Sequence, residues 1–387
     1  MVYGNFDLLK KIGMLSDYLG IDVGVLLLLV FIGAFSVQLF FFLFFFIRLV
    51  FYKQLDTTNH NLPVSVIIAA RNEEKNLIAN LPKIFEQDYP EFEVIVVNDR
   101  SWDDTADILN AFKQKYDNLH VVNIAESENY SHSKKFALTL GIKGAKYENL
   151  LFTDADCHPV SNKWITRMSR SFMRKSLILG YSPYQKKKGL LNKLIRFDTV
   201  QIGIQYLSFA LAGIPYMGVG RNMSYNKDLF FSVGGFKSHY HVASGDDDLF
   251  VNEVADNTTV SIVFEPDSQM ISLPELNYTD WCNQKRRHFT TAKYYRSKHK
   301  VLLSLFPVSF LLLVAAFIPL LFTQYWLVAI IGMAIRVLVQ LLILNKPMRA
   351  LGGSDLVIFA PLIELVFLII NPVIYFSNFI IKPTKWH

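Results

Sequence analysis

The stretch VSVIIAARNEEKNL, residues 64–77, decides the fold. Its β-branched apolar run ends at Ala70, and the polar segment 76–85 behind it has apolar residues at helical spacing, so a strand followed by a helix is predicted. Similar apolar runs return at 93–99 (EVIVVND), 120–124 (HVVNI) and 149–156 (NLLFTDAD). Strands that alternate with helices predict a parallel, doubly wound α/β sheet with its ligand site at the carboxyl ends of the strands.

Polar and acidic residues follow three of these apolar runs. They are Arg71, Asn72 and Glu73 after the first run, Asn98 and Asp99 after the second, and Asp154 and Asp156 after the fourth. Each one alone also fits a helix cap or a turn, and for Asn72 and Asp103 we favour the capping explanation. Their shared position at strand ends predicts a site at one edge of the sheet.

The segment TDAD, residues 153–156, is the most informative single motif. Two carboxylates separated by one residue at a strand end can hold a hard divalent cation, Mg²⁺ or Mn²⁺, which can neutralise a diphosphate leaving group. The bare pattern is common and also arises by chance or in turns. Its position after an apolar strand favours the metal site.

Four uncharged or nearly uncharged segments flank this region. Residues 23–47 carry no charge and exceed the ~20 residues that cross a bilayer. Arg48 and Lys53 mark the end of this segment as cytoplasmic by the positive-inside rule. Three more candidates lie at 301–322, 325–344 and 356–380. Arg336, in the middle of the third segment, must face protein, a cavity or lipid headgroups because a charge in lipid is costly.

We therefore expect three parts: residues 1–53, with a short interfacial helix and the first span; residues 54–300, a cytoplasmic domain; and residues 301–387, three further spans. The protein is expected to be integral to the cell (inner) membrane. Lys346 and Arg349 place the second connection between the C-terminal spans inside, but the same topology puts Lys382 and Lys385 outside, against the rule.

The composition excludes several other classes. Hydrophobic residues make up 52% of the chain and charged residues 19%, too many charges for a protein wholly in lipid. The two cysteines cannot make a disulfide framework, and no zinc-site spacing is present. The net charge is +6, and the basic residues gather beside the apolar runs. This distribution indicates a membrane surface or phosphate groups as the binding partner. Without a recognised nucleic-acid-binding motif, no nucleic-acid partner is expected.

Five segments together resemble the family 2 glycosyltransferases of GT-A fold. They are residues 64–77, 94–105 (VIVVNDRSWDDT), 133–142 (SKKFALTLGI), 151–156 (LFTDAD) and 244–250 (SGDDDLF). The resemblance runs from Pro63 to about Tyr295. It implies a cytoplasmic α/β domain with the Rossmann-like mixed sheet of the nucleotide-diphospho-sugar transferases, a metal-dependent, inverting sugar transfer, and a nucleotide-diphosphate sugar as donor.

The resemblance also assigns the donor side of the site. Ala70, Glu73 and Asp99 would hold the base and ribose, and Lys134 or Lys135 would lie near the sugar diphosphate. Asp154 and Asp156 would hold the metal and the sugar. Asn98 and Arg100 depart from the family's pattern and leave the nucleotide open, with a uridine diphosphate sugar favoured.

The acidic run 246–248 is assigned to the acceptor side. Inverting transfer needs a base opposite the leaving group, and a carboxylate among like charges keeps a raised pKa suited to that role. Alignment on Leu249 makes Asp246 the preferred base and Asp247 the second choice. The competing explanation is an acidic cap on a helix over 249–255. Beside these residues, the glycine-containing loop MGVGRN resembles the family's loop near donor sugar and acceptor, which brings in Gly220, Arg221 and Asn222.

The segment QKRRH, residues 284–288, resembles the QxxRW motif of membrane-bound synthases in this family. Gln284 and Arg287 would share one helical face, and Arg287 can contact a diphosphate oxygen pair. His288 replaces the family's Trp, so sugar transfer to a lipid or lipid-linked saccharide is favoured. A processive polysaccharide synthase and a non-catalytic membrane scaffold are the alternatives. The apolar segment 190–215 is expected to be a buried helix, with a membrane-surface helix as the alternative.

Overall fold

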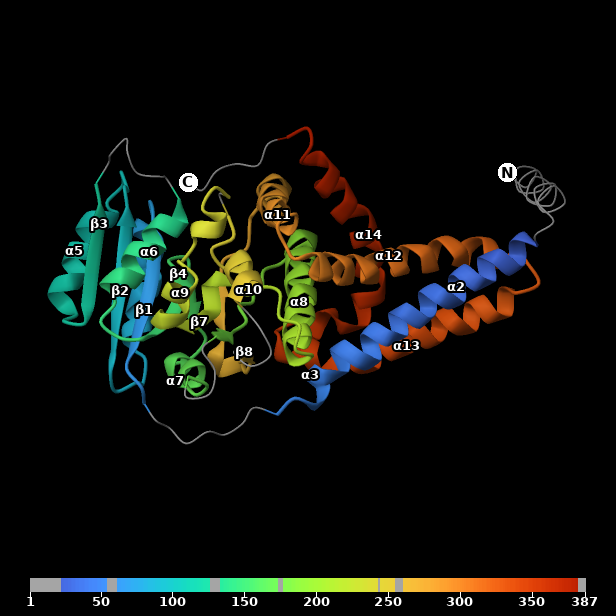
Figure 1. Ribbon diagram of the computed structural model, residues 1–387, viewed down its shortest axis with the longest axis horizontal. Helices are drawn as coiled ribbons and strands as arrows, with labels where there is room; N and C mark the ends of the chain where they lie inside the picture. The colour runs from blue at the N-terminus through green and yellow to red at the C-terminus, as the bar shows by residue number, and fades with distance from the viewer. Residues whose placement is uncertain are drawn as a thin grey trace.

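The computed structural model describes residues 22–53, 61–125, 133–172, 177–242, 244–254 and 260–381. An α/β domain forms one end of the molecule and long apolar helices form the other (Figure 1). The interfacial helix predicted for the first twenty residues, and Lys382 and Lys385, lie outside the described residues.

A seven-stranded mixed sheet, in the order β3-β2-β1-β4-β7-β6-β8, forms the centre of the domain. Its parallel part contains β1 (Val64–Ala70), β2 (Phe92–Asp99), β3 (Leu119–Ile124) and β4 (Asn149–Asp154). Its other strands are β6 (Leu177–Leu179), β7 (Met223–Asn226) and β8 (Val260–Ile262), of which β7 runs antiparallel to both β4 and β6. The four strands predicted from their apolar runs are confirmed, and the sheet is mixed, as the resemblance implied.

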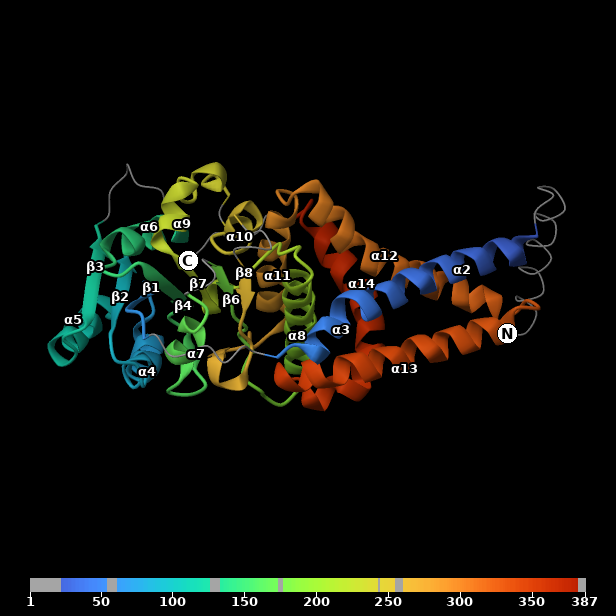
Figure 2. The same ribbon diagram turned by 60° about the horizontal axis from the view of Figure 1, so that its bottom comes forward.

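Helices cover both faces of the sheet (Figure 2). One face carries α4 (Glu74–Phe85), α5 (Thr105–Lys115) and α7 (Trp164–Ser169). The other carries α6 (Lys134–Gly144), α8 (Leu190–Leu211), α9 (Lys227–Ser232) and α10 (Asp248–Val254). Alternate residues of β1 enter the two cores, Val66 and Ile68 on the first face and Ile67 and Ala69 on the second. Burial on both faces explains why the strand sequence is continuously apolar.

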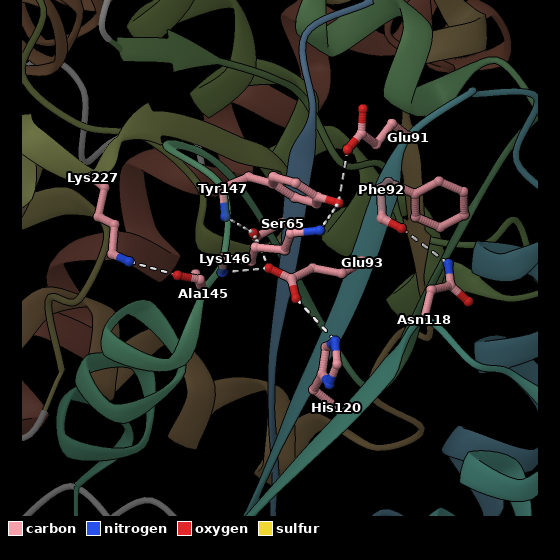
Figure 3. Close-up of polar contacts among 10 residues, drawn as sticks. All are labelled: Ser65, Glu91, Phe92, Glu93, Asn118, His120, Ala145, Lys146, Tyr147 and Lys227. Atoms are coloured by element: carbon pink, nitrogen blue, oxygen red, sulfur yellow. Dashed lines mark hydrogen bonds and ion pairs between the residues drawn. The ribbon is translucent and has the colours of Figure 1, made fainter.

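A polar cluster around Glu93 closes the edge of the sheet where β1 and β2 begin (Figure 3). The Glu93 side chain is buried, and its Oε1 accepts hydrogen bonds from Ser65 Oγ at 2.5 Å and from the Lys146 backbone N–H at 2.6 Å. His120 Nε2 lies 3.2 Å from Oε2. A buried carboxylate is tolerated only with such partners. The polar cluster therefore has a structural role at the amino ends of β1 and β2. The site lies at the opposite, carboxyl ends of the strands.

In the part of the chain that the structure describes, four helices are long and apolar enough to cross a membrane: Val23–Phe51, Ser297–Leu320, Trp326–Ala350 and Ser354–Ser377. The first comprises α2 (Val23–Phe40), the π-helical η1 (Phe41–Phe46) and α3 (Ile47–Phe51); the others are α12 (Ser297–Leu320), α13 (Trp326–Ala350), and η5 (Ser354–Phe359) with α14 (Ala360–Ser377). They match the four predicted apolar segments and fit a membrane-anchored protein. Phenylalanines of η1 join the bundle to the domain, with the Phe45 and Phe209 rings 4.4 Å apart.

Arg336 faces protein, one of the three surroundings that the sequence left open. Its guanidinium donates to Glu364 Oε2 at 2.7 Å, to Gln340 Oε1 at 2.6 Å and to Gln38 Oε1 at 3.0 Å. Glu364 was not predicted as its partner, although it lies in the fourth apolar segment. The ion pair is buried between α2, α13 and α14, which removes the cost of an isolated charge in lipid.

Candidate active site

A cavity of about 500 Å³ opens at the carboxyl ends of β1 and β4. Its walls come from α6, α8, α10, the loop before β7, and α11 (Tyr278–Ala292). This size lies in the range of small-molecule sites. The carboxyl ends of the strands, where the sequence predicted the ligand site, therefore border this cavity.

Lys134 connects the two acidic motifs across this cavity. It is the first residue of α6, whose N-terminus is capped by the Ser133 side chain. Lys134 Nζ lies 2.6 Å from Asp154 Oδ1 and 3.3 Å from Asp246 Oδ2. Burial alone would lower the pKa of Lys134, but the two carboxylates outweigh it and raise that pKa. The side chain is thus a permanent cation between the end of β4 and the acidic loop.

Asp156 is fixed at the same wall by a small antiparallel sheet of β5 (Cys157–Pro159) and β9 (Met270–Ser272). Its Oδ2 accepts a hydrogen bond from Ser272 Oγ at 3.1 Å. Burial, followed by the charges of Asp156, Asp154 and Asp103, raises the pKa of the neighbouring Glu73 to about 7, although Asn76 donates to it. Negative charge is therefore concentrated at this end of the cavity.

The carboxylates of the cavity are possible ligands of a divalent cation. Within the described residues, no group of three or more His, Cys, Asp or Glu side chains converges on a metal position. Asp154 and Asp156 do line one cavity. Mg²⁺ is commonly held by one or two carboxylates, with water and substrate phosphates supplying the other ligands. These two carboxylates fit that arrangement.

The acidic loop holds its three aspartates in different environments. Gly245 has φ +92°, and a Cβ there would meet Leu249 at 2.6 Å, so the turn requires glycine. Asp247 accepts backbone hydrogen bonds from Gly220 (2.8 Å) and Asp248 (2.7 Å). Asp248 accepts hydrogen bonds from Thr291 Oγ1 and Tyr295 OH and so ties α10 to α11. Asp246 faces Lys134.

The pKa directions correct one prediction. We expected a raised pKa on Asp246, but Lys134 and a backbone hydrogen bond outweigh its burial and lower the pKa. Burial, followed by the charges of Asp246 and Asp248, instead raises the pKa of Asp247 to about 7. Asp246 is therefore ionised at neutral pH, and Asp247 is the aspartate of this loop whose pKa lies near 7.

Helix α11 brings Gln284, Arg287 and His288 to the cavity, as the motif predicted. Tyr184 OH donates to Gln284 Oε1 at 3.3 Å, and Gln284 Nε2 donates to Glu275 at 3.2 Å. Burial, followed by the charges of Arg287 and other nearby cations, lowers the pKa of His288 to about 3. The residue in place of the family's Trp is thus a neutral imidazole.

Four of the predicted residues do not line the cavity. Lys135 points away, and its Nζ donates to the carbonyls of His239 (2.7 Å) and Val242 (3.0 Å), so its assignment to the diphosphate is wrong. Asn222 is also misassigned, because its buried side chain bonds Trp164, Tyr181 and Ser268.

Ala70 and Asp99 lie at the ends of β1 and β2, and Asp99 pairs with Arg100 at 2.6 Å. Their contacts with a nucleotide stay a prediction. The capping explanation holds for Asp103, which accepts the Thr105 and Glu74 backbone N–H groups. Gly220 and Arg221 do line the cavity.

Helix α8 contributes cavity residues that the motifs did not reveal. The predicted buried helix over 190–215 is confirmed, and Asp198 on it pairs with Lys285 of α11 at 2.7 Å. Trp281 and Ile202 add apolar wall. The signal that could have found Asp198 is an acidic residue in a mainly apolar helix whose other charged residues, Lys193 and Arg196, are both basic.

The mixed sheet, with carboxylates at its carboxyl edge and a cavity across them, defines a glycosyltransferase of GT-A type. A model of the family described as Glycosyl transferase family 21 matches residues 31–387. The chain belongs to this family. This confirms the resemblance to family 2-like glycosyltransferases.

Curated relatives match part of the chain. The probable glycosyltransferase YdaM of Bacillus subtilis is 29% identical over 45% of this chain and 42% of its own. A poly-beta-1,6-N-acetyl-D-glucosamine synthase of Staphylococcus epidermidis is 36% identical over 24% and 21%. The UDP-Glc:alpha-D-GlcNAc-diphosphoundecaprenol beta-1,3-glucosyltransferase WfaP of Escherichia coli is 30% identical over 32% and 47%. The chain thus spans less than half the length of these relatives.

Among solved structures, a mannosyltransferase from Pyrobaculum calidifontis in complex with GDP-Man and Mn²⁺ is similar in fold. It has a TM-score of 0.57 and 18% identity, and the match covers 88% of this chain and 98% of that one. At this identity the likeness establishes the fold.

Proposed function

We propose that the chain transfers a sugar from a nucleotide-diphosphate donor to a hydroxyl group of a lipid or lipid-linked saccharide, with inversion, at the cytoplasmic face of a cell (inner) membrane. The observation that carries the proposal is Lys134, which bridges Asp154 and Asp246 inside one cavity. The Lys134 side chain is thus the link between Asp154, proposed for the donor, and Asp246, proposed for the acceptor.

The reaction is a single displacement at the anomeric carbon. The acceptor oxygen forms the new bond as the bond to the diphosphate breaks, and Asp246 takes the hydroxyl proton. Lys134 keeps Asp246 ionised and therefore able to accept that proton. Asp247 is the second candidate base, but its two oxygens already hold backbone N–H groups, which suits it to shaping the loop.

The departing diphosphate needs positive charge. Lys134 lies beside Asp154, and Arg287 lines the same cavity from α11. A divalent cation, Mg²⁺ or Mn²⁺, held by Asp154 and Asp156 would neutralise the developing charge on the diphosphate oxygens. Glu73, Ala70 and Asp99 are proposed for the base and ribose, and Gln284 for the donor sugar's surroundings.

Names of similar proteins support the choice of substrates. WfaP is named for a UDP-sugar donor and a diphosphoundecaprenol-linked acceptor, and the mannosyltransferase structure holds GDP-Man and Mn²⁺. We favour a uridine diphosphate sugar. The match to a polysaccharide synthase favours processive transfer as a second candidate function.

Charge favours the cytoplasmic placement. Arg48, Lys293, Lys346 and Arg349 lie where the bundle meets the α/β domain, whereas residues 321–325, which connect α12 to α13 at the other end, carry no charge. By the positive-inside rule, this distribution of charge supports a cytoplasmic domain.

The test is a donor screen on membranes that contain the protein, with lipid extract as acceptor. UDP-glucose, GDP-mannose and other nucleotide sugars are supplied with Mn²⁺, Mg²⁺ or EDTA, and nucleoside diphosphate release and labelled lipid are scored. We expect metal-dependent release with one donor and a lipid product of defined size. No release with any donor would favour a scaffold, a long polymer would favour the synthase, and metal-independent transfer would contradict the role of Asp154 and Asp156.

A further inference from the structure

The last long helix, α14, follows a different course from the other apolar helices. The helix Val23–Phe51, α12 and α13 run side by side, away from the α/β domain, whereas α14 runs across the domain end of this bundle in both views (Figures 1 and 2). The far end of the bundle is where Gly24, at the start of α2, adjoins Tyr325, just before α13. The course of α14 does not lead there.

Contacts place both ends of this segment at the α/β domain. At its start, Asp355 of η5 accepts hydrogen bonds from Arg196 of α8 at 2.6 and 3.0 Å. At its end, Arg286 of α11 donates to Ser377 Oγ at 2.8 Å, and Asn378 Nδ2 donates to the Arg286 carbonyl at 3.2 Å. Helix α11 lines the catalytic cavity, so the end of α14 is fixed on the catalytic side.

The inner face of α14 is satisfied by protein. Glu364 pairs with Arg336, and the ring of Phe367 packs against Trp281 of α11 and Phe197 of α8 at 6.3 and 5.7 Å between centroids. These contacts hold the helix on the domain between α8 and α11. A crossing helix of 18 residues, ~27 Å long, would have to run with the bundle to pass a ~30 Å core.

The outer face of α14 is apolar and exposed. Its residues recur at helical spacing, which makes a single stripe: Leu362, Val366, Ile369, Val373 and Phe376, exposed by 43–69%. The bundle helices α12 and α13 carry exposed apolar residues of the same kind, such as Leu312 and Leu338, so we infer that the bilayer that covers them also covers the stripe. A helix with one apolar stripe and a protein-bound inner face suits the boundary between headgroups and acyl chains.

We propose that α14 does not cross the membrane but lies along its catalytic-side surface with this stripe immersed, so that the chain crosses three times. The chain after Ile381 then stays on the catalytic side of the membrane. This removes the conflict in the four-span topology, in which Lys382 and Lys385 lay on the wrong side. The proposal concerns membrane placement and does not depend on the identity of the sugar reaction.

The side of the C-terminus is the first test. The full chain carries an epitope tag after residue 387 in sealed vesicles of known orientation, and a membrane-impermeant maleimide reports Lys237→Cys on the domain and Thr323→Cys in the turn between α12 and α13. The parent protein gives the background from Cys157 and Cys282. We expect protease to remove the tag in the vesicles that label position 237. Removal only in those that label position 323 would overturn the proposal.

The second test measures how deeply α14 is immersed in the membrane. Its result does not depend on the accessibility of the C-terminal tag. A nitroxide attached at Ile369→Cys, midway along α14, is compared by power-saturation spectroscopy with the control Leu338→Cys, midway along α13; the two side chains are 69% and 57% exposed. A surface helix places the first label near the headgroups and the second near the bilayer centre. Equal, deep positions for both labels would show that α14 crosses.

Discussion

Replacing Lys134 with Met should move the acid limb of the pH–rate profile. The ammonium lies 3.3 Å from Asp246 Oδ2, and at an effective dielectric constant of about 20 two charges at that distance attract by about 5 kcal/mol. The side chains keep 19% and 12% exposure, and solvent screening reduces this to roughly half. A loss of ~2.5 kcal/mol corresponds to about 2 pH units.

The sign follows from the role of the base. Asp246 works when ionised, so its lowered pKa lets activity persist as the pH falls. Without Lys134 the pKa of Asp246 rises, and activity is lost at higher pH than in the wild type. The assay is kcat/KM for nucleoside diphosphate release against pH, which reports the free enzyme.

Lys134→Arg is the matched control, because it keeps the charge and should keep the wild-type acid limb even if the rate falls. An unshifted acid limb in Lys134→Met would refute the link between Lys134 and the base. A wild-type acid limb near pH 7 would contradict Asp246 as the base and would point to a carboxyl with a raised pKa, Asp247 or Glu73.

Three further changes give independent checks. Asp156→Asn should lower metal-stimulated release by at least about a hundredfold, because a bound metal supplies several kcal/mol of charge stabilisation; the exposed Asp107→Asn should not, and equal rates would contradict the metal site. Glu93→Gln should lower the free energy of unfolding by about 1–3 kcal/mol in denaturant titration, since it weakens a buried polar cluster, while KM stays unchanged; a changed KM would contradict its placement away from the site. Glu364→Gln leaves Arg336 buried without its counter-charge and should cost about 3–5 kcal/mol, read as a lower Tm in detergent; an unchanged Tm would show that this ion pair does not hold α14 in place.

The parallel half of the sheet was predictable because β1, β2 and β4 contain long apolar runs that are buried on both faces. The strands beyond β4 were not predictable from periodicity, because β6 and β8 have three residues each and the antiparallel β7 has four, too few to show a period. The resemblance supplied the mixed sheet instead. For Arg336 the sequence left protein, a cavity or lipid headgroups open, and its partner Glu364 was not predictable because it comes from a segment that composition alone describes as a span.

The site was predicted in part. Asp154, Asp156 and Asp246 converge because strand ends and the acidic loop meet at one edge, which the resemblance anticipates. Lys134 and Lys135 were left undecided, since adjacent helical residues point in directions about 100° apart and only the packing of α6 determines which one enters the cavity. The lowered pKa of Asp246 depends on that same choice, so the sequence alone favoured the wrong direction.

The most direct test of the central claim compares turnover in Asp246→Asn and in the wild type, with donor, lipid extract and Mn²⁺ present. The substitution keeps the size of the side chain and removes its ability to take a proton. We predict a fall in kcat of about 10²–10⁴-fold, with donor binding retained, as expected for loss of a general base. Wild-type turnover in Asp246→Asn would contradict the account.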